Sequence, residues 1–127
     1  MLIDEVLNLI HNAGIMTKQV NLFGYRMPGT PATCMVVRPT PGEGIEQTQE
    51  GITYHIPRFQ VFLRAESIGT AQTKMNQVEQ LLTFHNRTIG GVNYIKVEPV
   101  DGTAYLGQDD NDRALLSCNF RSEKRYG

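Results

Sequence analysis

Two cysteines and three histidines are the side chains of this sequence best suited to act as nucleophiles, bases or soft-metal ligands. Cys34 and Cys118 each lie inside an apolar run, which is typical of small buried hydrophobic residues in a reducing compartment. The sequence alone does not imply a disulfide between them. His11, His55 and His85 are scattered without ligand spacing, and two cysteines cannot complete a four-cysteine zinc site. A buried strand cysteine is usually inert, so we predict no nucleophile pair and no bound metal.

Acidic residues gather in two places, and neither pattern indicates chemistry. The run Asp109-Asp110-Asn111-Asp112 resembles a calcium loop, but Arg113 and an apolar stretch follow where a glycine and a distant glutamate are required. We predict a solvated turn there, whose charges discourage pairing at the edge of the next strand. Glu43, Glu46 and Glu50 lie in a glycine-containing stretch where no burial would raise a carboxyl pKa for acid catalysis.

The common catalytic motifs are missing as well. The sequence has no nucleophile elbow, no H-E-x-x-H pair and no Walker loop. The pair Gly42 and Gly44 lacks the further glycine and the strand-to-helix context of a dinucleotide site. We therefore expect a protein that is not an enzyme, with no catalytic residue and no cofactor.

Length and composition favour one globular domain that spans residues 1–127. A chain of 127 residues can bury a core without metals or disulfides, and 40% hydrophobic with 20% charged residues is ordinary for such a domain. The formal charge of −1 argues against binding by neutralisation of phosphates, so we expect no sequence-specific nucleic-acid partner. No stretch approaches the roughly 20 apolar residues that span a bilayer, and Asp4 and Glu5 stand where a signal peptide carries basic residues. No membrane partner is therefore expected.

Two segments have helical periodicity. Residues 2–12 carry an apolar stripe and an acidic first turn, and Gly14 is a natural stop. Residues 70–84 repeat apolar side chains at i, i+4, i+7 and i+11, with Ser67 or Thr70 as the N-cap. We expect both stripes to pack against a sheet.

Period-two alternation predicts the main strands. It is clearest over residues 58–66, where only Phe62 interrupts the polar face, and it recurs over residues 92–98 and 114–121. In the segment 92–98 this alternation would place three side chains on one face: Asn93, Ile95 and Val97.

Shorter strands and loops fill the rest of the chain. A strand is expected near residues 20–23 and another over 34–38, which should end at Pro39 because proline cannot donate to a sheet ladder. Residues 99–112 are polar and rich in turn formers, which favours a loop. Residues 40–52 are expected to form a flexible hairpin tip or an arm that orders against a partner.

These elements predict an α+β fold. We expect one mixed or antiparallel sheet of about four to five strands, with two helices packed on one face. The other face of the sheet must then meet solvent or another subunit.

Two stretches resemble a family of small tail proteins from long-tailed bacteriophages, known as tail terminators, tail completion proteins or minor capsid proteins. The first is Phe23-Gly24-Tyr25-Arg26-Met27-Pro28 with Cys34-Met35-Val36-Val37-Arg38-Pro39. The second is Tyr105-Leu106-Gly107-Gln108-Asp109, followed by Asp112-Arg113 and Asn119-Phe120. The similarity extends over nearly the whole chain in size and element order.

The resemblance implies a structural virion protein with no catalytic residues. Tail terminators form a six-fold ring on the head-proximal end of the tail tube, where the ring stops polymerisation and joins the neck. The implied partners are other copies of the chain in a hexameric ring, the tail tube protein and a neck or head-tail connector protein, after assembly in the bacterial host cytoplasm. Three regions are candidate contacts: Glu43, Ile45, Glu46, Gln47, Gln49 and Glu50; Tyr105, Leu106, Gln108, Asp109, Asp110 and Asp112; and Arg121, Lys124 and Arg125.

Two other classes of protein stay open at this point. Another neck or head-tail connector protein has similar size, because related folds serve several positions in a tail. A small cytoplasmic ligand-binding domain would instead need a concave pocket with convergent polar groups. The basic group at the C-terminus is compatible with a solvated tail or with a contact for an acidic partner.

Overall fold

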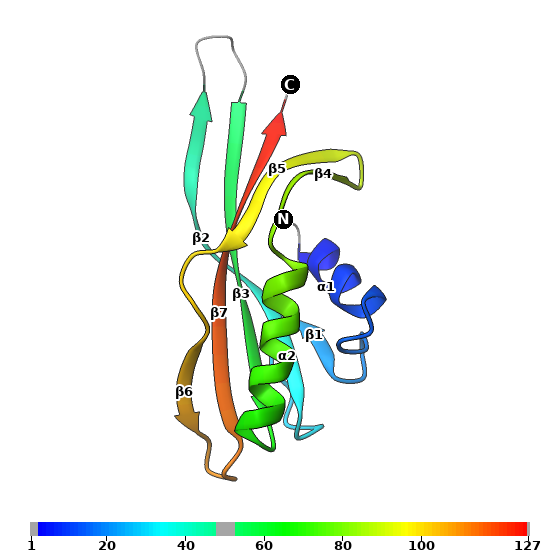
Figure 1. Ribbon diagram of the computed structural model, residues 1–127, viewed down its shortest axis with the longest axis vertical. Coiled ribbons are helices and arrows are strands. Elements are labelled where there is room, and N and C mark those ends of the chain that lie inside the picture. Colours follow the sequence, from blue (N-terminus) through cyan, green and yellow to red (C-terminus); the bar gives the residue numbers. More distant parts are fainter. Residues whose placement is uncertain (1–2, 48–52, 127) are drawn as a thin grey trace.

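The computed structural model describes residues 3–47 and 53–126, which form two helices and seven strands (Figure 1). The α+β class predicted from the sequence is therefore confirmed, but the sheet is larger than the four to five strands expected. In chain order the elements are α1 (Ile3–Asn12), β1 (Leu22–Gly24), β2 (Cys34–Gln47), β3 (Thr53–Ala65), α2 (Ile68–Leu81), β4 (Phe84–Ile89), β5 (Val92–Pro99), β6 (Ala104–Gln108) and β7 (Ala114–Tyr126).

The seven strands form one mixed sheet. Its order is β1-β2-β3-β7-β5-β4, and β6 pairs with the start of β7 beyond the end of β5. Only β1 and β2 are parallel, while the remaining pairs are antiparallel. The extra strands are short or exposed: β4 is the segment expected to end the second helix, and β6 lies in the predicted loop 99–112.

Strand β2 continues well past Pro39, so the predicted end of this strand is wrong. Its ladder with β3 includes Pro39 opposite Phe59 and reaches Gln47 opposite Thr53, with register shifts on the way. Among the described residues β1 covers β2 only as far as Val37, so the prolines lie on an edge where a missing N–H breaks no ladder. The expected arm 40–52 is thus a strand as far as Gln47, while residues 48–52 lie outside the described part of the chain.

The two helices begin and end close to the capping residues predicted from the sequence, with boundaries that differ by up to three residues. Gly14 follows α1 with φ of +76°, a conformation that favours glycine. Ser67 caps α2, and its hydroxyl accepts a hydrogen bond from the backbone N–H of Thr70 at 3.2 Å. Helix α2 begins at Ile68 and ends at Leu81, which leaves residues 84–89 free to form a strand. No helix among residues 3–47 and 53–126 has the length and apolar content to cross a bilayer.

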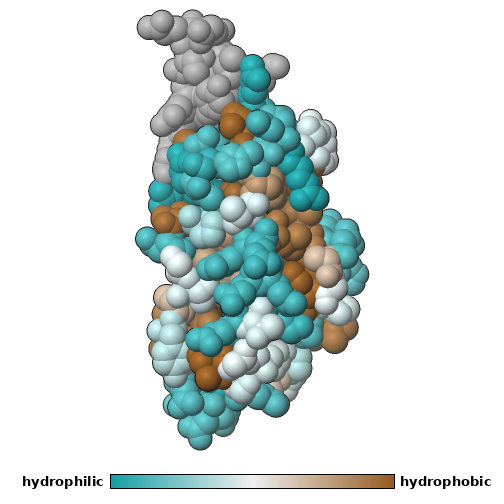
Figure 2. All heavy atoms as spheres, in the orientation of Figure 1, coloured by the Kyte–Doolittle hydropathy of each residue, from teal (hydrophilic) through white to brown (hydrophobic). Residues whose placement is uncertain are grey.

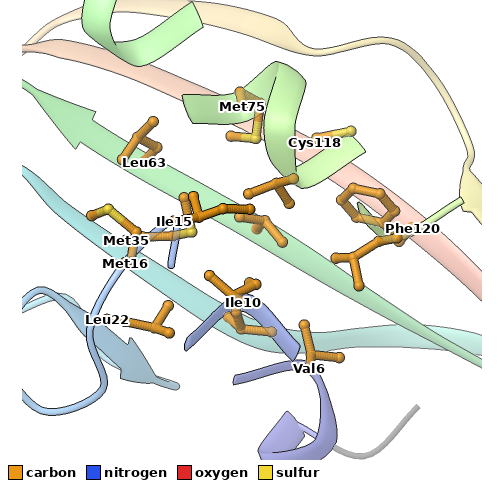
Figure 3. Packing of buried hydrophobic residues seen from close by; sticks show 14 of the residues in the cluster. Val6, Ile10, Ile15, Met16, Leu22, Met35, Leu63, Met75, Cys118 and Phe120 are labelled. Atoms are coloured by element: carbon orange, nitrogen blue, oxygen red, sulfur yellow. The ribbon is translucent and has the colours of Figure 1, made fainter. Parts of the chain in front are cut away.

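The core lies between the two helices and one face of the sheet (Figure 3). The inward positions of β3 and β7 alternate as predicted, and Phe59 stacks on Phe120 with ring centroids 5.1 Å apart. In β5 a register shift between Tyr94 and Lys96 turns Tyr94 and Val97 inward. The predicted shared face of Asn93, Ile95 and Val97 is therefore wrong, because a simple period of two does not survive a bulge.

The other face of the sheet is covered at one end and open elsewhere. At the covered end the guanidinium of Arg64 donates to the carbonyl oxygens of Pro28, Gly29, Pro31 and Ala32 at 2.7–3.2 Å. Arg64 is 6% exposed, and these hydrogen bonds offset the cost of burying its charge. Farther along, a polar ladder runs across three strands through Arg38, Gln60 and Asn119.

The Phe59→Ala substitution should lower the free energy of unfolding by about 3–5 kcal/mol, because it empties a fully buried and stacked site. Phe62→Ala is the matched control on the opposite face of the same strand. Phe62 is half-buried beneath the Arg38 guanidinium, so its loss should cost about 1 kcal/mol. Urea unfolding followed by circular dichroism measures both values, and equal losses would contradict the assigned faces.

Candidate functional site

The structure divides the predicted contact residues among three separate places. Backbone pairing places Glu43, Glu46 and Gln47 opposite residues of β3, and Ile45 lies on the same strand. Gln49 and Glu50 lie outside the described residues. The first candidate region is therefore the far part of the β2–β3 hairpin, which extends beyond the helices (Figure 1).

The acidic run forms the turn between β6 and β7, closed around one carboxylate. The Asp109 carboxylate accepts hydrogen bonds from the backbone N–H groups of Asn111 at 2.9 Å and Arg113 at 3.0 Å, and Arg113 Nε lies 2.7 Å from it. These interactions, led by the backbone N–H of Arg113, lower the pKa of Asp109, while burial opposes the shift. Asp109 thus shapes the turn, and Asp110 and Asp112 remain exposed at its surface.

A groove lies between the start of α2 and strand β6, and we call it the α2–β6 groove. It consists of two hollows of about 390 and 420 Å³ that share Gln72 and Tyr105. Apolar atoms reach the surface low on this face of the molecule, between α2 and β6 (Figure 2). The lining includes apolar, hydroxyl, amide and acidic side chains from α2, β6 and the segments next to them: Glu66, Ile68, Gln72, Asn76, Thr103, Tyr105, Gln108 and Asp112.

A small polar cluster under this groove fixes the link between β5 and β6. Thr103 Oγ1 donates to Glu79 Oε1 at 2.6 Å, and Cys118 Sγ lies 3.5 Å from the same oxygen and 3.7 Å from the carbonyl oxygen of Asp101. Burial, with the Glu79 carboxylate next, raises the pKa of Cys118 to about 12. Burial also raises the pKa of Cys34, so both free thiols stay protonated and unreactive at neutral pH.

The basic residues at the C-terminus do not form one patch. Arg121 pairs with Glu123 on β7, next to the Lys96–Glu98 pair on β5. The resulting group holds two positive and two negative charges. The alternation of β7 also directs Lys124 to the face opposite Arg121 and Arg125.

Lys124 instead lies opposite His55 on β3. Burial, followed by the positive charge of Lys124, lowers the pKa of His55. The basic cluster seen in the sequence is therefore divided between the two faces of the sheet. No single flat surface could contact all three residues at once.

A third surface, absent from the predicted contacts, lies at the β1 edge. Tyr25 follows β1 and is 64% exposed, and its backbone φ of 71° falls in the left-handed region. Arg26 lines a hollow of about 320 Å³ together with Lys18 and Phe23. The sequence contained the signal, an aromatic residue beside an arginine in a segment rich in glycine and proline. Its exposure became evident only once the fold was known.

Residues of α2 were also missed at the groove. Gln72 lies beside the apolar stripe that defined the helix, Ile68 lies one turn before the first residue of that stripe, and Glu66 precedes the cap. The spacing of Ile68 matches the stripe, so the sequence held no signal that this isoleucine is 43% exposed. Of the predicted residues, Tyr105, Gln108 and Asp112 do come together in the groove, whereas Leu106 stays 53% exposed outside its lining.

The titratable groups of the described residues do not converge on a reaction centre. His11 Nδ1 accepts the backbone N–H of Lys18 at 3.1 Å, and no group of three or more His, Cys, Asp or Glu side chains has metal-binding geometry in residues 3–47 and 53–126. The prominent surface features are the groove, the exposed β1 edge and the hairpin. Exposed aromatic and apolar side chains are enriched where proteins contact one another, so these surfaces are compatible with a protein that works by assembly.

Comparison with known families agrees with this class. Residues 9–126 match the family described as bacteriophage tail terminator protein. The match covers nearly the whole chain, so this protein belongs to the bacteriophage tail terminator family and is a structural protein of the phage tail. The resemblance noted in the sequence is thereby confirmed.

The fold is also found in a solved virion. The chain is similar to a protein in the structure titled "Virion of native gene transfer agent (GTA) particle", with a TM-score of 0.61 and 14% identity. The similarity covers 98% of this chain and 92% of the other. At this identity the likeness concerns the fold. Among curated proteins, none matches this sequence.

Acidification should loosen the turn between β6 and β7 only below the ordinary carboxyl pKa of 3.8. The pKa of Asp109 is lowered from its ordinary 3.8, so the carboxylate stabilises the turn above that value and loses its effect as pH falls through the lower folded value. Amide NMR signals of Asn111 and Arg113 measure this transition. Asp109→Asn should remove it and Asp110→Asn should not. Amide shifts that titrate at or above pH 3.8 would contradict the assignment.

Proposed function

We propose that this protein caps the head-proximal end of the phage tail tube as a hexameric ring. In this role it stops tail polymerisation and presents the surface on which the neck of the filled head docks. Membership of the tail terminator family supports a place in the virion and in the tail. Beyond family membership, we propose three things: that the chain forms a hexameric ring, that the ring lies at the head-proximal end of the tube, and that it contacts the tube and the neck.

The observation that carries the proposal is that the sheet has two dissimilar edges. One edge is β1 with the exposed part of β2, and the other is formed by β4 and β6. A contact between unlike surfaces of identical subunits is heterologous, and it closes into a ring when the rotation per subunit divides a full turn. A six-fold ring needs such a contact and its complement on every copy.

The β2–β3 hairpin is the proposed contact with the tail tube. It carries Glu43, Ile45, Glu46 and Gln47 on a two-stranded extension beyond the helices (Figure 1). A two-stranded ribbon contributes little to the core, whose β2 members are Met35 and Val37. An isolated two-stranded hairpin is only marginally stable, so contacts with a partner would stabilise this ribbon.

The charged groups of the strands are proposed to contact an acidic surface of the tail tube or of the neck. Arg125 and Lys124 lie near the same end of the sheet as the hairpin, on opposite faces. Acidic groups on the tube or the neck protein would complement them. Arg121 contributes less, because Glu123 already neutralises it.

Light scattering on the purified chain, followed by electron microscopy with short assembled tail tubes, tests the ring. The expected result is a hexamer, in solution or on the tubes, that caps one end of each tube and blocks its extension. A chain that stays monomeric and leaves both tube ends free at high concentration would refute the proposal. Binding to portal-side proteins alone would favour a neck protein instead.

Deletion of residues 43–50 should leave a folded domain that caps tubes poorly. The deletion removes ribbon pairing beyond Pro41 and no member of the described core, so the far-ultraviolet circular dichroism should persist. Capping counted by electron microscopy should fall steeply. Loss of the cooperative unfolding transition would show that the hairpin belongs to the folding core, contrary to the proposal.

A further inference from the structure

We propose that adjacent subunits are joined by insertion of Tyr25 and Arg26 of one copy into the α2–β6 groove of the next. The occupant of the groove is thus a second copy of this chain. The inference deepens the ring proposed above and rests on it. It names the two surfaces that meet, which we call the Tyr25–Arg26 knob and the α2–β6 groove.

The knob is exposed and held in a strained conformation. Tyr25 has φ of 71° and is 64% exposed, while its backbone N–H donates to the Val37 carbonyl at 2.9 Å. A tyrosine with positive φ is uncommon, and such strain persists where the surroundings impose it and function uses it. The phenol side chain of Tyr25 faces solvent, so packing within the subunit does not explain its strained backbone. Tyrosine is, however, enriched at protein interfaces.

The segment after the knob is fastened to the sheet. The buried Arg64 guanidinium binds the carbonyl oxygens of Pro28, Gly29, Pro31 and Ala32, and β1 before the knob is paired to β2. Both flanks of the knob are therefore fixed in the free subunit. Insertion then costs little conformational entropy, since the inserted residues are already in place.

The groove complements the knob in shape and charge. Its hollow of about 390 Å³ has Ile68 and Tyr105 as apolar walls, which suits an aromatic ring. Glu66 and Asp112 provide carboxylates for a guanidinium. Among the described residues, neither carboxylate nor the Arg26 guanidinium is engaged in an ion pair within the subunit.

The two surfaces lie on opposite edges of the sheet. The strand order puts β1 at one end, and β6 forms the other edge beside α2 (Figure 1). A subunit therefore offers its knob to one neighbour and its groove to the other. This head-to-tail arrangement is the heterologous contact that a closed ring requires.

Two complementary variants isolate the contact. The knob variant carries Tyr25→Asn and Arg26→Glu, because asparagine tolerates positive φ while it removes the ring. The groove variant carries Glu66→Lys and Asp112→Asn, and the latter also keeps a residue suited to the φ of 59° at that position. Each variant alone should self-associate at least about tenfold more weakly than the wild-type chain.

Mixed together, the two variants should form a 1:1 dimer and nothing larger. The knob variant retains its groove and the groove variant retains its knob, so one contact of the ring can form. Sedimentation velocity measures the dimer, and circular dichroism verifies that both variants are folded. A folded chain with Arg26→Glu and Glu66→Lys together should regain self-association, because the charge pair is restored with reversed sign.

Arg87→Glu on β4 is the control for charge reversal on the same edge as the groove but outside its lining, so it should assemble like the wild-type chain. A mixture of folded variants that stays monomeric overturns the contact. So does a knob variant that caps tubes as well as the wild-type chain. If the 1:1 dimer forms while the wild-type chain leaves tubes uncapped, the contact stands and the proposed function fails.

Discussion

The antiparallel ladder between β3 and β7 is the constraint on which the rest of the structure depends. It keeps one register from the pair Thr53 and Tyr126 to the pair Ala65 and Ala114. Over residues 59–65 and 114–120 the inward side chains of both strands form one apolar face. The Phe59–Phe120 stack lies within it, and α2 packs on it, while α1 packs on the neighbouring strands β1 and β2. Every other strand is attached to one side or the other of this pair, which is how the sheet acquires two unlike edges.

Arg64 shows how the covered end of the opposite face is organised. A buried guanidinium is costly unless its donors are satisfied, and here four backbone carbonyls of one irregular segment satisfy them. The same hydrogen bonds hold a segment rich in proline and glycine that has little secondary structure of its own. One charged residue on a central strand thereby holds the segment that follows the exposed tyrosine, while pairing with β2 places β1 itself.

The sequence predicted those elements in which the spacing of apolar residues matches the side chains that are buried. The alternation of 58–66 and the cap at Ser67 were predicted because each is set within a few neighbouring residues. Strands β4 and β6 were missed because their residues are mostly exposed and show no alternation. The length of β2 was missed because proline was assumed to end it, whereas an edge strand tolerates proline. The groove was beyond prediction, since Glu66 and Tyr105 meet only through long-range pairing.

The character of the edges also bears on the proposed contact between subunits. An open strand edge invites backbone pairing with any other chain, and proteins suppress this with proline, charge, bulges and short strands. Strand β2 beyond Val37 carries Arg38, Pro39 and Pro41, and β6 is five residues long with a register shift at Gly107. Both edges are thus poor templates for indiscriminate strand addition. In the proposed ring, specificity between copies would depend on side chains, which can match in shape and charge and so admit a copy in one orientation only.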